Sequence, residues 1–139
     1  MGARRRGRIL AVQALYAWDI NKQPVEGLCR FEWVDPEERE DLEEAFTFAR
    51  LLLTGTLQEI EQIDELIRAQ LEHWDFSRVS RVELAILRVS VYALRFQSGI
   101  PPRVVIDEAI DIAKRFSGDE SYRFINGVLD AIHKCGQTQ

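Results

Sequence analysis

The sequence predicts an all-α protein. Apolar residues recur at steps of three and four through most of the 139-residue chain, which is the period of helices with one buried face. Signals typical of helix starts, a capping residue followed three positions later by Glu, precede two of these segments. The pair Asn126-Gly127 would suit a hairpin turn, but its flanks repeat at the helical period and not at the strand period.

The first helix is expected over residues 4–20, because Ala11, Val12, Leu15 and Trp18 fall on one face. Its start, as a first turn or a frayed arm, carries a basic cluster made of Arg4, Arg5, Arg6 and Arg8. Positive charge at the amino end of a helix opposes the helix dipole. The cluster therefore favours an anionic ligand such as nucleic acid, with a solvated surface as the alternative.

A long second helix is predicted over residues 36–71. Asp35 is a suitable N-cap, Pro36 suits the first helical position, and Glu38 follows three residues after the cap. Gly55 is expected to bend or break this helix. Its many acidic residues are interpreted as its solvated face.

The next helix is expected from a capping box at Ser80 and Glu83 to about residue 97, and it has the most apolar residues. Arg81, Arg88 and Arg95 are seven residues apart and thus form one line along it. This line either contacts RNA or is a solvated edge that pairs with acids of the long helix.

Two more helices are expected over residues 102–116 and 119–134. Gly99 to Pro102 introduce the former, and Asp119 is predicted to cap the latter. Gly inside a helix costs about 1 kcal/mol relative to Ala. Gly127 therefore predicts a close crossing with another helix.

Charge is distributed unevenly along this acidic chain, whose formal net charge is −5. Residues 26–75 hold fifteen acidic and four basic side chains, whereas residues 78–103 hold five arginines and one glutamate. Both basic zones contain aromatic residues. Since RNA-binding proteins combine cations for phosphates with rings for bases, RNA is a candidate ligand.

Several other classes of protein are disfavoured. Cys29 and Cys135 lack the spacing of a disulfide framework or a zinc site, and His73 and His133 are isolated. Asp107 and Asp111 could be read as paired carboxylates, but no nucleophile or phosphate-binding motif accompanies them. Asp111 suits an ordinary pair with the residue four positions later. We expect no enzyme activity, cofactor or metal, and a soluble, cytoplasmic protein without a membrane span.

Five segments of the chain form a recognisable set. They are Arg4-Arg5-Arg6-Gly7-Arg8 with Ala11 to Trp18, Ala85-Ile86-Leu87-Arg88 with Val91-Tyr92, Ile100-Pro101, Val105 to Ile110 with Ala113-Lys114, and Phe124 to Asp130. Together, in order and at the family's spacing, they resemble the bacterial NusB family of transcription antitermination proteins. Pro102 and residues 22–35 depart from the family pattern.

The resemblance implies about six to seven helices in two small bundles, and a single RNA-binding domain over residues 1–139 with a basic arm at residues 1–8. NusB-like proteins bind boxA RNA of ribosomal RNA operons together with NusE, a small-subunit ribosomal protein. They act without catalysis on the RNA polymerase elongation complex with other Nus factors. The RNA contacts that the resemblance implies are Arg4, Arg5, Arg6, Arg8, Tyr16, Arg88, Arg123 and Phe124.

The resemblance places NusE beside Glu83. For Tyr16 and Phe124, core packing is the alternative to base stacking. Both monomers and homodimers are compatible with the family. Two other readings stay open: a protein-binding adaptor without RNA affinity, and the RNA-binding module of a ribosomal RNA cytosine methyltransferase, for which a chain ending at Gln139 is expected to be too short.

Overall fold

A computed structural model describes residues 1–72, 75–118 and 120–137, and within these ranges every regular element is a helix. The all-α prediction is confirmed. The elements are α1 (Ala3–Asn21), α2 (Val25–Leu28), η1 (Arg39–Leu42), α3 (Glu43–Gln58), α4 (Ile60–Ala69), η2 (Phe76–Arg78), α5 (Arg81–Arg95), α6 (Pro102–Phe116) and α7 (Ser121–Gln137), where η marks 3₁₀ helices.

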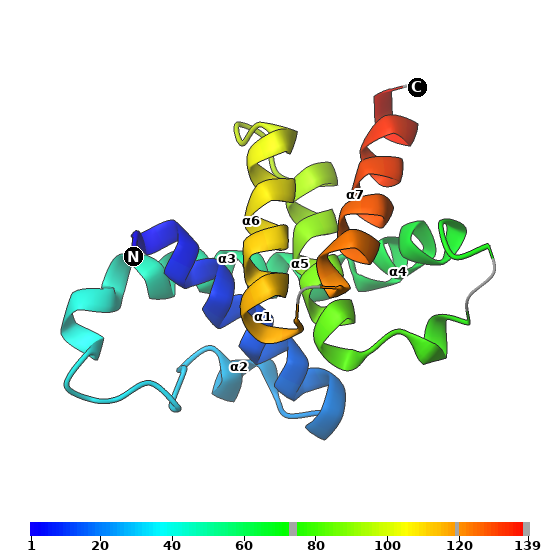
Figure 1. The fold of residues 1–139 in the computed structure, drawn as a ribbon. Helices are drawn as coiled ribbons and strands as arrows, with labels where there is room; N and C mark the ends of the chain where they lie inside the picture. Colours follow the sequence, from blue (N-terminus) through cyan, green and yellow to red (C-terminus); the bar gives the residue numbers. More distant parts are fainter. Residues whose placement is uncertain (73–74, 119, 138–139) are drawn as a thin grey trace.

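The helices form two groups that share α5. In the first group α1 lies along α3, and in the second α5, α6 and α7 lie side by side (Figure 1). α5 also packs against α1, α3 and α4, so a single apolar interior continues from one group into the other. Its residues Leu84 to Val91 are all buried, which confirms α5 as the central helix.

Gly7 lets α1 and α3 approach each other closely. A Cβ atom at this position would lie 2.9 Å from the carbonyl oxygen of Ala45 and 2.9 Å from Cδ2 of Phe48. Any larger residue would force the two helices apart. The glycine within the arginine cluster therefore brings the cluster against α3.

The prediction of one long helix from Pro36 is wrong at its start. The backbone N–H of Glu38 donates to the Asp35 carbonyl at 3.0 Å, so the chain makes tight turns before η1, and α3 begins only at Glu43. Arg39 explains the departure. Its guanidinium donates to the backbone carbonyls of Phe31 at 2.7 Å and Arg30 at 2.6 Å, which holds this segment on the preceding loop.

The long helix also breaks at Glu59 and not at Gly55. Glu59 has φ −106° and ψ 17°, outside the helical region, and α4 starts directly after it. Gly55 lies within α3, where an added Cβ would overlap the ring of Tyr92 on α5. Close packing of two helices, and not a bend, accounts for this glycine.

The remaining helix starts agree in part with the predictions. Ser80 accepts a hydrogen bond from the Glu83 amide at 3.1 Å, as its capping role requires, but the Glu83 carboxylate accepts from the Ser121 hydroxyl at 2.7 Å. No atom outside its own helix would lie within 4 Å of a Cβ at Gly127, so the predicted close crossing there is wrong. The predictions for His73 and the Asp119 cap fall outside the described residues.

Candidate RNA-binding surface

The arginine cluster at the start of α1 is ordered by contacts with α6. Arg5 donates to the Glu108 carboxylate from Nε at 3.1 Å and from Nη2 at 3.2 Å, and to Asp111 from Nη2 at 3.0 Å. The hydrogen bonds and charge of Glu108 raise the pKa of Arg5. The cluster is therefore the first two turns of a helix, fastened across the middle of α6.

Two other arginines of the cluster lie on an aromatic ring of α3. The guanidinium carbons of Arg4 and Arg8 are 5.4 and 5.3 Å from the centre of the Phe48 ring. Burial lowers the pKa of Arg8. A ring orients a cation without cancelling its charge, so Phe48 fixes the positions of both guanidinium groups. Arg6 lies 3.9 Å from Glu38.

The predicted stacking residues differ in exposure. Tyr16 is 38% exposed and borders a hollow with Val12, Gln13, Val82 and Phe116, so its ring lies at the surface and outside the core. Phe124 is half-buried and packs partly against the core. Tyr16 is thus the more accessible of the two rings, while Phe124 has a structural role in any case.

Arg88 is not at the surface, contrary to the prediction that it contacts RNA. It is 6% exposed, and its Nε and Nη2 donate to both carboxylate oxygens of Asp64 at 2.8 and 2.9 Å. Asp19 lies 3.7 Å away, and the rings of Trp18 and Phe76 lie 5.8 and 5.9 Å from its guanidinium carbon. Of the alternative interpretation, a solvated edge paired with acids of the long helix, the pairing is confirmed and the solvated position is wrong.

The other two arginines of the seven-residue line have separate partners. Arg81 donates from Nη1 to both carboxylate oxygens of Asp19 at 2.9 and 3.0 Å, and Arg95 donates to the Ile132 carbonyl at 3.2 Å. The line therefore joins α5 to α1, α4 and α7 and is not a continuous basic stripe.

Glu83, the residue expected to meet a protein partner, borders a second hollow with Ser80, Val82, Phe116, Ser117, Glu120 and Ser121. This hollow shares Val82 and Phe116 with the one beside Tyr16. The two predicted binding regions, one for RNA and one for protein, are therefore neighbours on one surface.

Comparison with known proteins identifies this architecture. The model of the NusB family matches residues 5–134. The chain belongs to the NusB family. The transcription antitermination protein NusB of Treponema pallidum (strain Nichols) is 51% identical over 134 residues, which cover 94% of this chain and 92% of that protein.

Solved structures of the NusB family have the same fold. A chain in the crystal structure of the antitermination factors NusB and NusE in complex with dsRNA superposes with a TM-score of 0.84 at 30% identity, over 97% of this chain and 98% of that chain. NusB of T. maritima superposes with a TM-score of 0.82 at 36% identity, over 94% of this chain and 90% of that chain.

Sequence reasoning missed the residues that hold the arginine cluster in place. Phe48 and Glu108 were given no role in holding the cluster, and Asp111 was expected to pair with Arg115. In the structure Asp111 binds Arg5 instead. Contacts between helices so distant in sequence leave no local pattern, although Gly7 inside an otherwise charged helical turn hinted at a close neighbour.

The carboxylates that could have suggested catalysis are engaged in ion pairs. Asp111 binds Arg5 at 3.0 Å and Asp107 binds Arg103 at 3.4 Å. Among the described residues, no three His, Cys, Asp or Glu side chains are grouped as a metal site would require. None of the described helices is long and apolar enough to cross a membrane.

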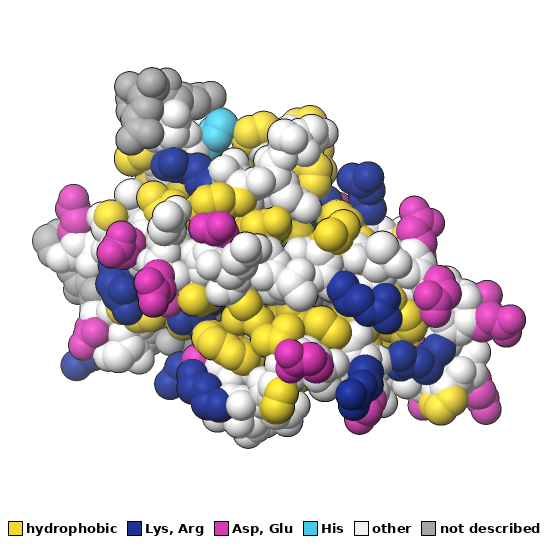
Figure 2. All heavy atoms as spheres, turned by 180° about the vertical axis from the view of Figure 1, so that it is seen from behind, with side chains coloured by type: hydrophobic (Ala, Val, Ile, Leu, Met, Phe, Trp, Pro, Cys, Tyr) yellow, Lys and Arg dark blue, Asp and Glu magenta, His cyan; other side chains and the backbone are white. Residues whose placement is uncertain are grey.

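The face opposite to the α6 side has a different character. Figure 2 shows hydrophobic side chains in a central strip there, with acidic and basic side chains interspersed around it and acidic ones frequent at one edge. No basic cluster dominates this view. The arm and α6 lie on the other side of the molecule, in front in Figure 1.

Proposed function

We propose that this chain is a transcription antitermination factor that binds boxA RNA of ribosomal RNA operons together with NusE. It acts in the cytoplasm on the RNA polymerase elongation complex with other Nus factors, and it acts by binding, without catalysis. The observation that carries this proposal is the ordered arginine cluster of α1 in a chain that belongs to the NusB family. The complex of NusB and NusE with dsRNA supports both partners.

The RNA contacts we propose are the surface members of the predicted set. Arg4, Arg5, Arg6 and Arg8 provide cations for phosphates, and Tyr16 provides a ring for a base. Arg123 and Phe124 on α7 are included, whereas the buried Arg88 is left out and acts from inside by joining α1, α4 and α5. We propose that residues 1–139 work as a single RNA-binding unit.

The arm experiment tests RNA binding directly. Replacing Arg4, Arg5 and Arg6 together by alanine should weaken binding to boxA RNA and flatten its salt dependence, because single strands release about 0.7 counterions per neutralised phosphate. A control variant with alanine at Arg30, Arg103 and Lys134 removes the same charge at exposed positions outside the arm. If the RNA affinity of the arm variant depends on salt as steeply as that of the control, the arm is not part of the RNA interface.

Cooperation with NusE follows from the small size of this surface. Few phosphate contacts give weak binding alone, so RNA should bind more tightly when NusE contributes its own surface. Thermodynamic linkage requires RNA to strengthen the protein pair by the same factor. The measurement is an RNA titration at fixed salt, with and without saturating NusE. Equal affinities in the two titrations would leave only a solitary RNA binder or a protein adaptor.

Glu83 provides the test for the protein interface. Glu83→Lys should weaken NusE binding, but this change also removes the acceptor of the Ser121 hydrogen bond. Glu83→Gln keeps an acceptor for Ser121 and removes only the charge, so it separates the two effects. The arm variant should bind NusE normally when RNA is absent.

A further inference from the structure

A group of three exposed cations lies where α6 ends and α7 begins. Lys114 and Arg115 are in the last turn of α6, and Arg123 is in the first turn of α7. The ion pairs of the described residues include none of these three cations, and Asp119 in the α6–α7 connection lies outside those residues. Other exposed cations on the same two helices are paired, Arg103 with Asp107 and Lys134 with Asp130. We call Lys114, Arg115 and Arg123 the α6–α7 basic patch.

Aromatic rings hold these cations instead. Lys114 Nζ lies 4.6 Å from the centre of the Tyr122 ring, and the guanidinium carbon of Arg123 lies 5.9 Å from the same ring. Arg115 lies 5.7 Å from the ring of Phe116, which is 42% exposed. A hydrogen bond to Tyr122 raises the pKa of Arg123. The patch resembles Arg4 and Arg8 of the arm in this respect, because rings orient its cations and no carboxylate of a described residue pairs with them.

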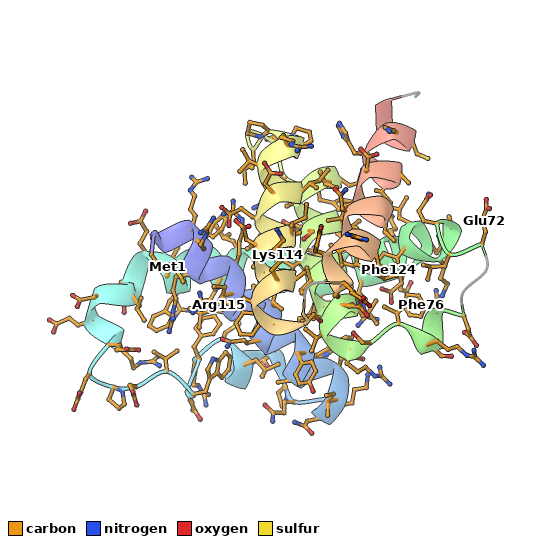
Figure 3. The ribbon with its side chains drawn as sticks, viewed as in Figure 1. Met1, Glu72, Phe76, Lys114, Arg115 and Phe124 are labelled. Atoms are coloured by element: carbon orange, nitrogen blue, oxygen red, sulfur yellow. The ribbon has the colours of Figure 1, made fainter. Side chains whose placement is uncertain are left out.

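The patch continues the surface of the arm. Arg5 binds Asp111 on α6, and Arg115 follows Asp111 by four residues, which is one helical turn and about 6 Å along the axis. Figure 3 shows Arg115 on the side of α6 toward α1 and Lys114 in front, between α6 and α7. The phosphate backbone of an RNA strand on the arm can therefore reach the α6–α7 basic patch without crossing an unpaired acidic residue of α6.

The side of the arm at Arg6 borders an acidic segment. Arg6 borders a hollow there that is lined by Glu37, Glu38 and Asp41, and only Glu38 has a cation within 4 Å. Phosphates approaching this side would meet unneutralised carboxylates. The acidic segment thus disfavours an RNA path beyond Arg6, so a strand that contacts Arg6 continues toward α6.

We propose that Lys114 and Arg115 bind backbone phosphates of the same single-stranded RNA that the arm binds. Tyr122 is then a positioning residue that orients Lys114 and Arg123. This inference rests on the proposed RNA-binding function and extends it from α1 and α7 to the last turn of α6. The competing explanation is purely structural, since cations in the last turn of a helix interact favourably with its dipole.

The test is a double variant, Lys114→Gln and Arg115→Gln, which keeps the side-chain stems and the helical propensity. Each lost phosphate contact should make the slope of log affinity against log salt shallower by about 0.7. A variant that matches the unaltered protein at about 1 M salt should then bind about fivefold more weakly than it at about 0.1 M. The matched control is Arg103→Gln with Lys134→Gln, which removes two exposed cations from the same helices. All variants are titrated with one boxA-like oligonucleotide and melted thermally.

The outcomes separate this inference from the function it extends. A double variant with about 25-fold weaker binding, a reduced slope and a normal melting temperature supports the patch. If its affinity and slope equal those of the control while the arm variant still loses binding, the patch is overturned and the RNA-binding function stands. If the unaltered protein binds no such RNA, both are overturned. A lower melting temperature of the double variant with unchanged RNA affinity would show that Lys114 and Arg115 only stabilise α6 through its dipole.

Tyr122 supplies a second measurement. Tyr122→Phe keeps the ring under Lys114, whereas Tyr122→Leu keeps an apolar side chain but removes the ring. The leucine variant should bind RNA several-fold more weakly than the phenylalanine variant at equal melting temperature. Equal binding by the two variants would show that the ring does not position the cations.

Discussion

Asp64→Ala should destabilise this protein far more than an average surface substitution. The change leaves the guanidinium of Arg88 buried, with its side chain 7% exposed, and removes the partner of both Nε and Nη2. Asp19 lies 3.7 Å from Nη1, too far for a hydrogen bond, and Nη1 already lacks a hydrogen-bond partner. Ala is a better helix former than Asp, so helix propensity opposes the loss.

The expected magnitude follows from removing one partner of a buried ion pair. Such a change typically costs about 3–5 kcal/mol, because the remaining charge is desolvated without compensation. Unfolding entropy of about 2.1 cal/mol/K per residue gives about 0.29 kcal/mol/K for a chain of 139 residues. The melting temperature should therefore fall by about 10–17 °C.

Thermal melts of Asp64→Ala and of two further variants test the predicted loss of stability. Asp107→Ala is the control, since it breaks an exposed pair with Arg103 and should cost at most about 0.5 kcal/mol. Combining Asp64→Leu with Arg88→Met should recover most of the stability, because no unpaired charge then remains between these two positions. A loss below about 1 kcal/mol in Asp64→Ala would refute the reasoning and indicate that Arg88 reaches solvent easily.

Three further outcomes are expected. Tyr16→Ala should weaken RNA binding by about 1–3 kcal/mol in titrations while the melting temperature changes little, because the ring is 38% exposed. A large drop in melting temperature with normal binding would assign the ring to the core. Gly55→Ala should destabilise the fold, since its Cβ would overlap Tyr92. Gly127→Ala should raise the free energy of unfolding by about 0.5–1 kcal/mol in chemical denaturation, because Ala is the better helix former and its Cβ meets no neighbour. Changes of the same sign in the two variants would contradict this packing. Burial raises the pKa of the Cys29 thiol, so its thiolate fraction at pH 8 is below that of a free cysteine. Alkylation of Cys29, followed by mass spectrometry, should be slower than that of a cysteine peptide and should accelerate as pH rises; a faster reaction would exclude the raised pKa.

The sequence allowed the helices to be predicted where local signals and tertiary contacts agree. Ser80 as a capping residue and the prolines at the start of α6, Pro101 and Pro102, marked helix starts correctly, since caps and proline act within one turn. Asp35 and Pro36 gave an equally clear signal that the structure does not follow. There the side chain of Arg39 donates hydrogen bonds to backbone carbonyls of the preceding loop. These contacts override the local helix-start signal, and no local pattern in the sequence predicts them.

The candidate site shows the same limit. The positions of the basic cluster and of the exposed Tyr16 were predictable, because charge and periodicity are visible in the sequence. The burial of Arg88 could not be predicted, because a seven-residue spacing is the same for a line of exposed arginines and for arginines that bind to neighbouring helices. Its acidic partners, Asp19 and Asp64, lie 69 and 24 residues away along the chain.

The position of α5 between the two helix groups has a consequence for how the molecule unfolds. Because its buried face contacts helices on both sides, neither group can lose its structure while the other keeps a complete interior. Opening of the molecule should therefore be one cooperative event, in which the amides of α5 exchange with solvent most slowly and report the global free energy of unfolding. Ligands that engage only one group, whether RNA on the arm or a protein beside Glu83, would protect the amides of the other group as well.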